Sequence, residues 1–493
     1  MSNKYDVLLI NMHAKGLSAY LEKRPAPQYR EPLGLLYLAA YLIKNNIKVK
    51  ILDLNIKHFK NLNNIVKEAL RYKPKIIGIP TFTALIASCL KLAKAIKKEN
   101  KDIFIVFGGP HATFDDTIGL KSKLVDFVIR KEGELTLLEL VETILDGQTD
   151  YSKIKGITYF ANGKIKRNPD RPFIKNLDNL PFPERNLLSS KYYMKGHRVN
   201  ILTSRGCPYN CIFCVSPNFW NKIVRFRTPQ NVDKELEEFF KRYKKILPKK
   251  FYINIADDTF TINKKRALDI CEVLKKYNIP WFASSRINTV DEELLKKMKE
   301  CGCIKIRFGI ESGNQRILNI LNKNQTIPQI ISTIRLSKKY NLITEGSFMI
   351  CNPTESKREV LRTIEFAKSI PLDFAFFFIT VPYPGTDILK FCPKYFNRYD
   401  WTENLSSVDK VHIRKNFFDK NERMDPKEKM NLLAEAYYQF YVRNKKLTPP
   451  SNYNKIKDPL RKIKMLQSLV DIQAEKLGVF MTLTKFLGQR KWT

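Results

Sequence analysis

Short apolar runs alternate with longer amphipathic segments through the first 145 residues of the chain. The apolar runs are typical of buried parallel strands and lie at 5–10, 48–53, 76–79, 103–107 and 127–129. Between them, apolar residues recur at helical spacing, which predicts helices over 34–43, 65–72, 84–98 and from about 134 to 145. Strands that alternate with helices across short connections predict an open parallel α/β sheet with helices on both faces.

The alternation weakens between residues 149 and 195. The runs 156–160 and 164–166 flank Ala-Asn-Gly, a spacing that predicts a β-hairpin. Three prolines, Pro172, Pro181 and Pro183, then interrupt regular structure. We therefore interpret 149–195 as a hairpin and linker that follows an N-terminal domain of residues 1–148.

Alternating strands and helices return from residue 196 to about residue 400. Strands are predicted at 199–203, 251–255, 281–284, 304–308, 346–350 and 374–378. The helices predicted between them include 264–277, 292–300 and 356–368. Six strands with intervening helices predict a partial (β/α)6 TIM barrel, and the carboxyl ends of its strands should carry the active site.

The last part of the chain, 401–493, is predicted to be a helical domain. Within 427–444, apolar side chains recur at helical spacing: Leu432, Leu433, Ala436, Tyr437, Phe440 and Tyr441. The chain ends in a basic, aromatic segment, 485–493. Such helices can cover the open side of a barrel or lie at a membrane interface, and the sequence leaves both open.

Composition and charge narrow the picture only slightly. The chain of 493 residues is 44% hydrophobic, as globular proteins are, and carries a formal net charge of +38. Its lysines are spread over the whole length rather than gathered in blocks, so we expect a lysine-coated surface and no nucleic-acid partner. Without a signal-peptide pattern or an apolar run that could span a bilayer, we expect a cytoplasmic protein, with peripheral membrane contact as the alternative.

The most informative local pattern is a cysteine array, Cys207-x3-Cys211-x2-Cys214, which directly follows the strand predicted at 199–203. Thiolates this close on one loop are typical ligands of iron–sulfur clusters. Three cysteines rather than four leave one iron open. A zinc site is the alternative, but it would normally provide a fourth Cys or His nearby.

This array, with Phe213 before the third cysteine, resembles the signature of the radical S-adenosylmethionine (SAM) superfamily. The resemblance implies a 4Fe–4S cluster on Cys207, Cys211 and Cys214. It also implies SAM on the open iron, from which the reduced cluster generates a 5′-deoxyadenosyl radical. A reductant such as ferredoxin or flavodoxin and an oxygen-free setting are further implications.

Polar residues at the predicted strand ends match further elements of the superfamily. Asp257 and Asp258 take the place of an acidic loop that accepts hydrogen bonds from the SAM amino group, and Arg286 the place of a partner of its carboxylate. Glu311 and Ser312 are expected to face the ribose or the methionine end. Relatives often have Gly-x-Pro-Gly-Glu after the fifth strand, whereas this chain has Asn352-Pro-Thr-Glu355 preceded by Cys351. The alternative is a purely structural charge cluster at the barrel rim.

The N-terminal block is similar to the Rossmann-like cobalamin (B12)-binding domain that precedes many radical SAM cores. The resemblance rests on segments 32–41, 107–113 and 131–134. It implies cofactor-binding residues in the loops after the strands: Thr81, Thr83, Gly108, Gly109, His111 and Glu132. Asn11-Met-His13 departs from the D-x-H-x-x-G motif of other cobalamin domains, and we interpret His13 as coincidental because the acidic residue is missing.

Together these features resemble cobalamin-dependent radical SAM enzymes, which implies methylation of an unactivated carbon by a monomeric enzyme acting on a small molecule or lipid. Three alternatives stay open. The first is radical ring closure or oxidation, as in the anaerobic magnesium-protoporphyrin cyclase. The second is tRNA methylthiotransfer, disfavoured because only Cys89 precedes the core. The third is a non-enzymatic cobalamin- or redox-responsive binding protein, disfavoured by the residues that match a SAM site.

Overall fold

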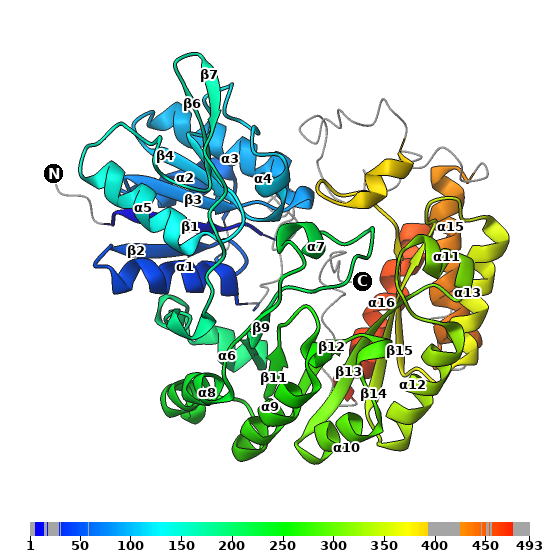
Figure 1. The fold of residues 1–493 in the computed structure, drawn as a ribbon. Coiled ribbons are helices and arrows are strands. Elements are labelled where there is room, and N and C mark those ends of the chain that lie inside the picture. The colour runs from blue at the N-terminus through cyan, green and yellow to red at the C-terminus, as the bar shows by residue number, and fades with distance from the viewer. Residues whose placement is uncertain are drawn as a thin grey trace. The chain divides into compact units, whose positions relative to one another are not determined.

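The computed structural model describes residues 5–13, 17, 29, 31–57, 59–392, 424–444, 446–449, 453 and 456–476. The chain divides into two compact units, one ending at Gly196 and the other beginning at His197. Each unit contains one large sheet, drawn in blue to cyan and in green to yellow in Figure 1.

The sheet of the first unit has seven strands in the order β2-β1-β3-β4-β5-β6-β7. Its five parallel strands are β1 (Val7–Asn11), β2 (Val49–Asp53), β3 (Ile76–Pro80), β4 (Phe104–Gly108) and β5 (Phe127–Ile129). The predicted parallel α/β sheet is confirmed. Because β1 lies between β2 and β3, the strand order reverses there, and ligands of such sheets bind beyond the carboxyl ends near this point.

Helices cover both faces of this sheet because its strands are apolar on both sides. In β1, Leu8 and Ile10 pack on one face with α2 (Leu62–Arg71) and α3 (Ile86–Glu99). Val7 and Leu9 pack on the other face with α1 (Leu33–Lys44) and α5 (Glu134–Leu145). Because side chains alternate along a strand, each strand contributes apolar side chains to two separate hydrophobic cores, one on each face of the sheet.

The hairpin predicted after the parallel strands extends the same sheet. β6 (Ile157–Ala161) pairs antiparallel with β5, and β7 (Lys164–Arg167) pairs antiparallel with β6. The following segment, with α6 (Lys191–Gly196), is tied back to residue 31, since Arg185 Nε and Tyr193 Oη both donate to Glu31 Oε1, at 3.0 and 2.9 Å. The division into domains at 148, 195 and 400 stays a prediction.

The sheet of the second unit has six parallel strands in the order β15-β14-β13-β12-β11-β8. They are β8 (Arg198–Ile201), β11 (Tyr252–Ile255), β12 (Trp281–Ser285), β13 (Cys303–Glu311), β14 (Ile343–Ile350) and β15 (Phe374–Ile379). β8 and β15 form the two edges, as an incomplete barrel requires. The predicted partial (β/α)6 barrel is confirmed.

Helices connect these strands, and hydrogen bonds from side chains cap the first turn of several helices. The helices are α7 (Ser216–Phe219), α8 (Pro229–Tyr243), α9 (Lys264–Tyr277), α10 (Glu292–Glu300), α11 (Gln315–Ile320), α12 (Ile327–Lys339) and α13 (Lys357–Ser369). Reciprocal hydrogen bonds of Thr326 with Gln329, and of Ser356 with Glu359, cap α12 and α13. The predicted bounds of α9 and α10 agree with the structure to the residue.

The C-terminal helices α15 (Pro426–Tyr437) and α16 (Pro459–Lys476) follow, with a π-helical turn at Tyr438–Arg443. The apolar stripe predicted here packs on the edge strand β15. Tyr441 Oη donates to Ala375 O at 2.9 Å, and the Tyr437 ring lies edge-on to Phe377. This part of the stripe therefore covers the core sheet, while the basic tail 485–493 lies outside the described residues.

Candidate active site

The cysteine array lies on a loop that leaves the carboxyl end of β8. A two-residue strand, β9 (Ser204–Arg205), pairs with β10 (Arg225–Phe226) and closes the base of this loop. Gly206 has φ +102°, and a Cβ atom there would lie 2.0 Å from Ile223 O, so only glycine fits this turn. Cys207, Cys211 and Cys214 follow, all as free thiols, and the Cys214 amide donates to Cys211 O at 3.1 Å.

The environment of these thiols suits a positively charged metal centre. Burial, together with the charges of Cys211, Asp258 and Cys207, raises the pKa of Cys214 to about 12. Burial likewise raises the pKa of Cys207. Thiolates at Cys207 and Cys214 are therefore costly here unless iron compensates their charge. Across the described part of the chain, no three His, Cys, Asp or Glu side chains converge as the ligands of a single ion would. In a cluster each cysteine binds a different iron, so such convergence is not required.

The two adjacent carboxylates after β11 have different surroundings. Asp257 is buried and accepts hydrogen bonds from the backbone and hydroxyl groups of Thr203 and Ser204, at 2.5–3.0 Å. Arg266 on α9 lies 3.4 Å from the same carboxylate. Asp258 accepts hydrogen bonds from Ser216 Oγ, at 2.6 Å, and from the Trp220 side chain, and burial raises its pKa. Asp257 thus anchors the start of the cysteine loop, whereas Asp258 has more capacity to accept hydrogen bonds from a ligand.

Arg286 directly follows β12 and contacts the cysteine loop. Its Nη1 lies 3.1 Å from Cys211 Sγ, and its guanidinium carbon lies 3.7 Å from the centroid of the Tyr209 ring. Cys211 and Arg286 are both buried. A cation that donates to a cluster cysteine can stabilise the negative charge on its sulfur. The structure therefore brings together two residues that are 75 positions apart in the sequence.

Glu311 is the last residue of β13 and Ser312 follows it, but the two side chains make different contacts. Glu311 has φ +71° and forms a buried ion pair with Lys323, with 2.7 Å between Oε1 and Nζ. Ser312 is fully buried, with its hydroxyl 3.0 Å from Thr363 Oγ1, and accepts from the Asn314 amide. Sequence reasoning missed Lys323, because one of 87 basic residues gives no local signal.

The segment after β14 keeps a glycine-like backbone without glycine. Cys351 and Thr354 stand at the two positions where relatives often have glycine, and both have φ +60°. Such angles cost a side-chain-bearing residue of order 1–3 kcal/mol and persist only when surrounding contacts impose them. Glu355 supplies one such contact, since its Oε2 accepts from the Asn352 amide at 2.8 Å. Cys351 and Thr354 thus have backbone angles that glycine favours, although neither residue is the glycine of the Gly-x-Pro-Gly-Glu pattern.

In the first unit, the loops after β3 and β4 interlock. Gly109 has φ +93°, and a Cβ atom there would lie 3.1 Å from Thr81 O. Thr81 Oγ1 donates to Gly108 O at 2.9 Å and accepts from the Ala112 amide at 3.1 Å. His111 Nδ1 lies 3.1 Å from Thr83 Oγ1, and burial lowers the pKa of His111 to about 4, so its ring is neutral. Five of the six predicted cobalamin-binding residues are therefore neighbours.

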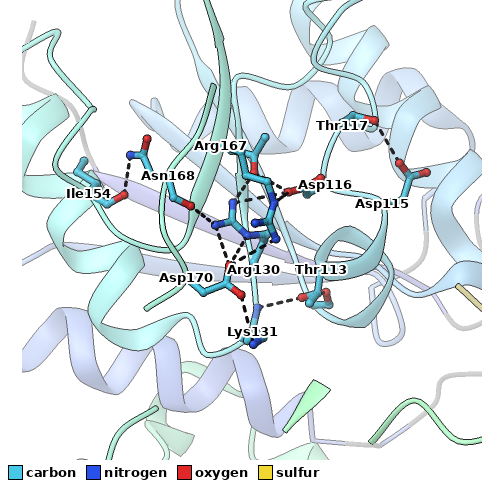
Figure 2. Close-up of polar contacts among 12 residues, drawn as sticks. Thr113, Asp115, Asp116, Thr117, Arg130, Lys131, Ile154, Arg167, Asn168 and Asp170 are labelled. Atoms are coloured by element: carbon cyan, nitrogen blue, oxygen red, sulfur yellow. Dashed lines mark hydrogen bonds and ion pairs between the residues drawn. The ribbon is translucent and has the colours of Figure 1, made fainter. Parts of the chain in front are cut away.

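The sixth, Glu132, lies in the loop after β5, and its Oε2 accepts from the Ile174 amide at 2.9 Å. Figure 2 shows the polar network at the start of this loop. Arg130, only 2% exposed, contacts Asp170, the Asn168 carbonyl, Thr158 and Asp116. The network fixes the hairpin β6–β7 to the end of β5. His13 is buried just beyond β1. Residues 14–16, which complete the segment compared with the D-x-H-x-x-G motif, lie outside the described residues.

Comparisons with known proteins give matches for both units. A model of the B12 binding domain matches residues 24–141, and a model of the radical SAM superfamily matches residues 201–367. An uncharacterized methyltransferase of Pyrococcus horikoshii is 37% identical over 425 residues, covering 84% of this chain and 89% of the relative.

Two further similarities are more distant. The anaerobic magnesium-protoporphyrin IX monomethyl ester cyclase of Rubrivivax gelatinosus is 28% identical over 436 residues, covering 86% of this chain and 76% of the cyclase. The solved structure of the cobalamin-dependent S-adenosylmethionine radical enzyme OxsB with aqua-cobalamin bound superposes with a TM-score of 0.71 at 20% identity. It covers 96% of this chain and 72% of OxsB, a likeness of fold. Within the described residues, no helix combines the length and hydrophobicity that crossing a bilayer requires.

Proposed function

The chain belongs to the family of cobalamin-dependent radical SAM methyltransferases, and we propose that it methylates an unactivated carbon of a small-molecule substrate. The resemblance found in the sequence is thereby confirmed. The chain is an enzyme whose cofactors are cobalamin, a 4Fe–4S cluster and SAM. When bound, the cluster and SAM supply hydrogen-abstracting radical chemistry, and cobalamin supplies the methyl group.

We assign the cluster to Cys207, Cys211 and Cys214. The observation that carries this assignment is the contact of Arg286 Nη1 with Cys211 Sγ, because it sets a predicted SAM ligand beside a predicted cluster ligand. The donor set supports it as well: three free thiols lie on one loop, and burial raises the pKa of two of them, Cys207 and Cys214, so a cationic partner would stabilise their thiolates.

For SAM we assign direct contacts to Asp258, Arg286 and Glu311, with Phe213 beside them. A carboxylate can accept from the amino group of SAM, and a guanidinium can hold its carboxylate in a bidentate pair. Asp257 and Ser312 act by positioning, since their polar atoms already bind Thr203, Ser204 and Thr363.

For cobalamin we assign the loops that hold Thr81, Thr83, Gly108, Gly109, His111 and Glu132. Gly109 supports this because its left-handed backbone brings the turn after β4 to within contact of the loop after β3. Small residues and backbone groups along such an edge let a bulky ligand approach closely. The neutral, buried His111 would shape this surface through Thr83 rather than carry charge.

The same proposal includes the reductant of the cluster, the location and oligomeric state of the enzyme and the class of its substrate. A low-potential carrier such as ferredoxin or flavodoxin would reduce the cluster, and the enzyme would act as a cytoplasmic monomer. Its substrate would be a small molecule or a lipid, with peripheral contact to a membrane in the second case. Nucleic acid is not expected, because the basic residues are dispersed along the sequence.

The test is anaerobic reconstitution with iron, sulfide and cobalamin, followed by dithionite and SAM labelled on its methyl group. A cobalamin absorption spectrum together with 5′-deoxyadenosine and S-adenosylhomocysteine supports methyl transfer, since methylating cobalamin consumes one SAM and radical formation another. If the substrate is present and 5′-deoxyadenosine forms without S-adenosylhomocysteine, ring closure or oxidation would be favoured instead, the outcome suggested by the cyclase relative. Binding of cobalamin with no SAM cleavage would favour a binding protein.

A further inference from the structure

The loop after α11, residues 321–325, touches three segments that carry predicted cofactor ligands: the cysteine loop, the end of β12 and the end of β13. Leu321 O accepts from the Ile212 amide at 3.2 Å, and Asn322 Nδ2 donates to Asn210 O at 2.9 Å, so both hold the cysteine loop. Gln325 Nε2 donates to Ile310 O at 2.8 Å, next to Glu311. The segment therefore connects the cysteine loop with the end of β13.

Lys323 lies at the centre of this segment and connects it to two predicted SAM ligands. Its ammonium group pairs with Glu311, and its carbonyl oxygen accepts a hydrogen bond from Arg286 Nη2. The ammonium nitrogen also lies 5.7 Å from the centroid of the Phe213 ring, between the second and third cysteines. Lys323 is only 4% exposed, so these contacts form where water screens little.

Gly309 gives independent support for the importance of the ion pair. A Cβ atom at this position would lie 2.4 Å from Glu311 Oε1 and 2.7 Å from Lys323 Nζ. Gly309 is not in a left-handed conformation, so its backbone does not itself require glycine. The space next to β13 is instead occupied by the two charged groups, which explains the residue by packing.

We propose that Lys323 is a positioning residue that holds Glu311 and Arg286 in the geometry needed to bind SAM next to the cysteine loop, an inference that rests on the proposed function. Without the ammonium group, the buried Glu311 carboxylate loses its countercharge and its side chain shifts. Arg286 keeps its backbone partner only while the segment 321–325 stays in place. Lys323 thus acts on SAM through two other residues and does not itself take part in the reaction.

The test compares Lys323→Met with Lys323→Arg in the reconstituted holoenzyme, using labelled SAM in anaerobic equilibrium dialysis. Lys323→Met should raise the Kd of SAM about tenfold, the effect of losing one charge-assisted contact. Lys323→Arg should restore most of the affinity because it keeps the charge. Iron and sulfide content should stay at the wild-type level in both variants, because the cysteines are unchanged.

Double substitution separates positioning from general loss of stability. If Lys323 acts through Glu311, Lys323→Met in a Glu311→Gln background should weaken SAM binding much less than it does alone. Gly309→Ala offers a second route, since its methyl group would displace the same pair and should also raise the Kd. Lys339→Met, which removes an exposed ion pair with Glu292, is the matched control and should leave the Kd unchanged.

Two results would overturn the inference. One is a Lys323→Met variant that is less stable or holds less iron but binds SAM with wild-type Kd, which would make Lys323 purely structural. The other is full additivity with Glu311→Gln. Failure of the proposed function would look different. Ring closure or oxidation in place of methylation would give 5′-deoxyadenosine without S-adenosylhomocysteine in the wild type while SAM still binds, and a protein without SAM chemistry would bind no SAM at all.

Discussion

The two units present their strand ends in different ways. In the first unit, the charged residues near the end of β5 neutralise one another: Arg130 meets Asp116 and Asp170, and Arg167 meets the same two acids. Five of the six residues predicted to bind cobalamin are glycines, threonines and a histidine whose pKa burial lowers to about 4, and the sixth is Glu132. In the second unit, thiols, carboxylates and an arginine gather at the strand ends and contact one another across loops.

This difference follows from what each edge is proposed to bind. A large cofactor held over a broad surface needs close backbone approach, so charges there serve to fix the loops rather than to touch the ligand. A small zwitterion such as SAM and an iron–sulfur cluster need charged partners at defined positions. One edge is thus built mainly from backbone shape and the other mainly from side-chain chemistry.

Removing a cysteine gives the largest expected effect and affects only the second unit. Cys211→Ala should reduce iron content and lower deoxyadenosine formation on the order of 10³-fold or more, because the ligands act as a set. Cobalamin binding should persist, which iron analysis and absorption spectra would establish together. Cys271→Ala, a buried cysteine on α9, is the control that should keep its iron. Loss of cobalamin from Cys211→Ala would contradict the separation of the two edges.

Removing the buried arginine tests the first unit in the same way. Burial raises the pKa of Asp170, but Arg130 and Lys131 outweigh it and hold that pKa below its usual value. Arg130→Met leaves Asp116 and Asp170 without this partner and should cost about 2 kcal/mol of unfolding free energy, discounted because Asp170 is partly exposed. Cobalamin affinity should fall while iron content stays constant, as urea unfolding and spectra would report.

The matched control for this change is Arg167→Met, in the same network but with a side chain that is 55% exposed. It should cost no more than about 0.5 kcal/mol, since exposed ion pairs contribute little. Equal losses from the two variants would mean that burial of Arg130 is not what holds the hairpin to β5.

A smaller, pH-dependent effect sharpens the comparison, because each unit contains an acid near a strand end whose pKa burial raises well above its usual value. Burial raises the pKa of Glu355 to about 7 and that of Asp53 to about 6. Such an acid binds a proton more tightly in the folded than in the unfolded chain, so it stabilises at low pH and this stability is lost as pH rises through the folded pKa. Relative to Glu355→Gln, the wild type should lose about 2 kcal/mol between pH 5 and pH 8.

Urea unfolding of the wild type and of Glu355→Gln at pH 5 and pH 8 measures this difference. The contributions of the other titrating groups cancel because both proteins contain them. The stability of the wild type relative to Asp53→Asn should change less over the same pH range. This change should be complete by about pH 7, because the folded pKa of Asp53 is lower than that of Glu355. A Glu355→Gln variant that follows the wild type at every pH would show that the pKa of Glu355 is the same in the folded and the unfolded chain.

Much of this architecture could be predicted because its signals are local. Apolar runs such as 76–79 and 127–129 became strands, since each is flanked by polar or turn residues and is too short for a helix. The cysteine array was equally legible, because cluster ligands from one loop must be close in sequence. The hairpin 157–167 was also predicted, but not that it would pair with β5, because pairing partners depend on which edge is left uncovered.

The separate roles of Asp257 and Asp258 mark the limit of that reasoning. Both look alike in the sequence, and both were expected to contact SAM. In the structure Asp257 accepts hydrogen bonds from Thr203 and Ser204, which become its neighbours only because β8 and β11 pair in parallel. Contact with SAM stays a prediction for both carboxylates. Similarly, no pattern singled out Lys323 or explained Gly309, since their partners come from other loops.

The sequence by itself determined the two α/β units, their strands and helices, the cysteine array and the family, because periodicity and short spacings are properties of neighbouring residues. Only the tertiary structure decided which charges neutralise one another at Arg130 and which meet at Arg286, Glu311 and Lys323. The physical reason is that burial and charge compensation depend on distances between segments far apart in the chain. Those distances are set by packing of the whole sheet and not by any local stretch.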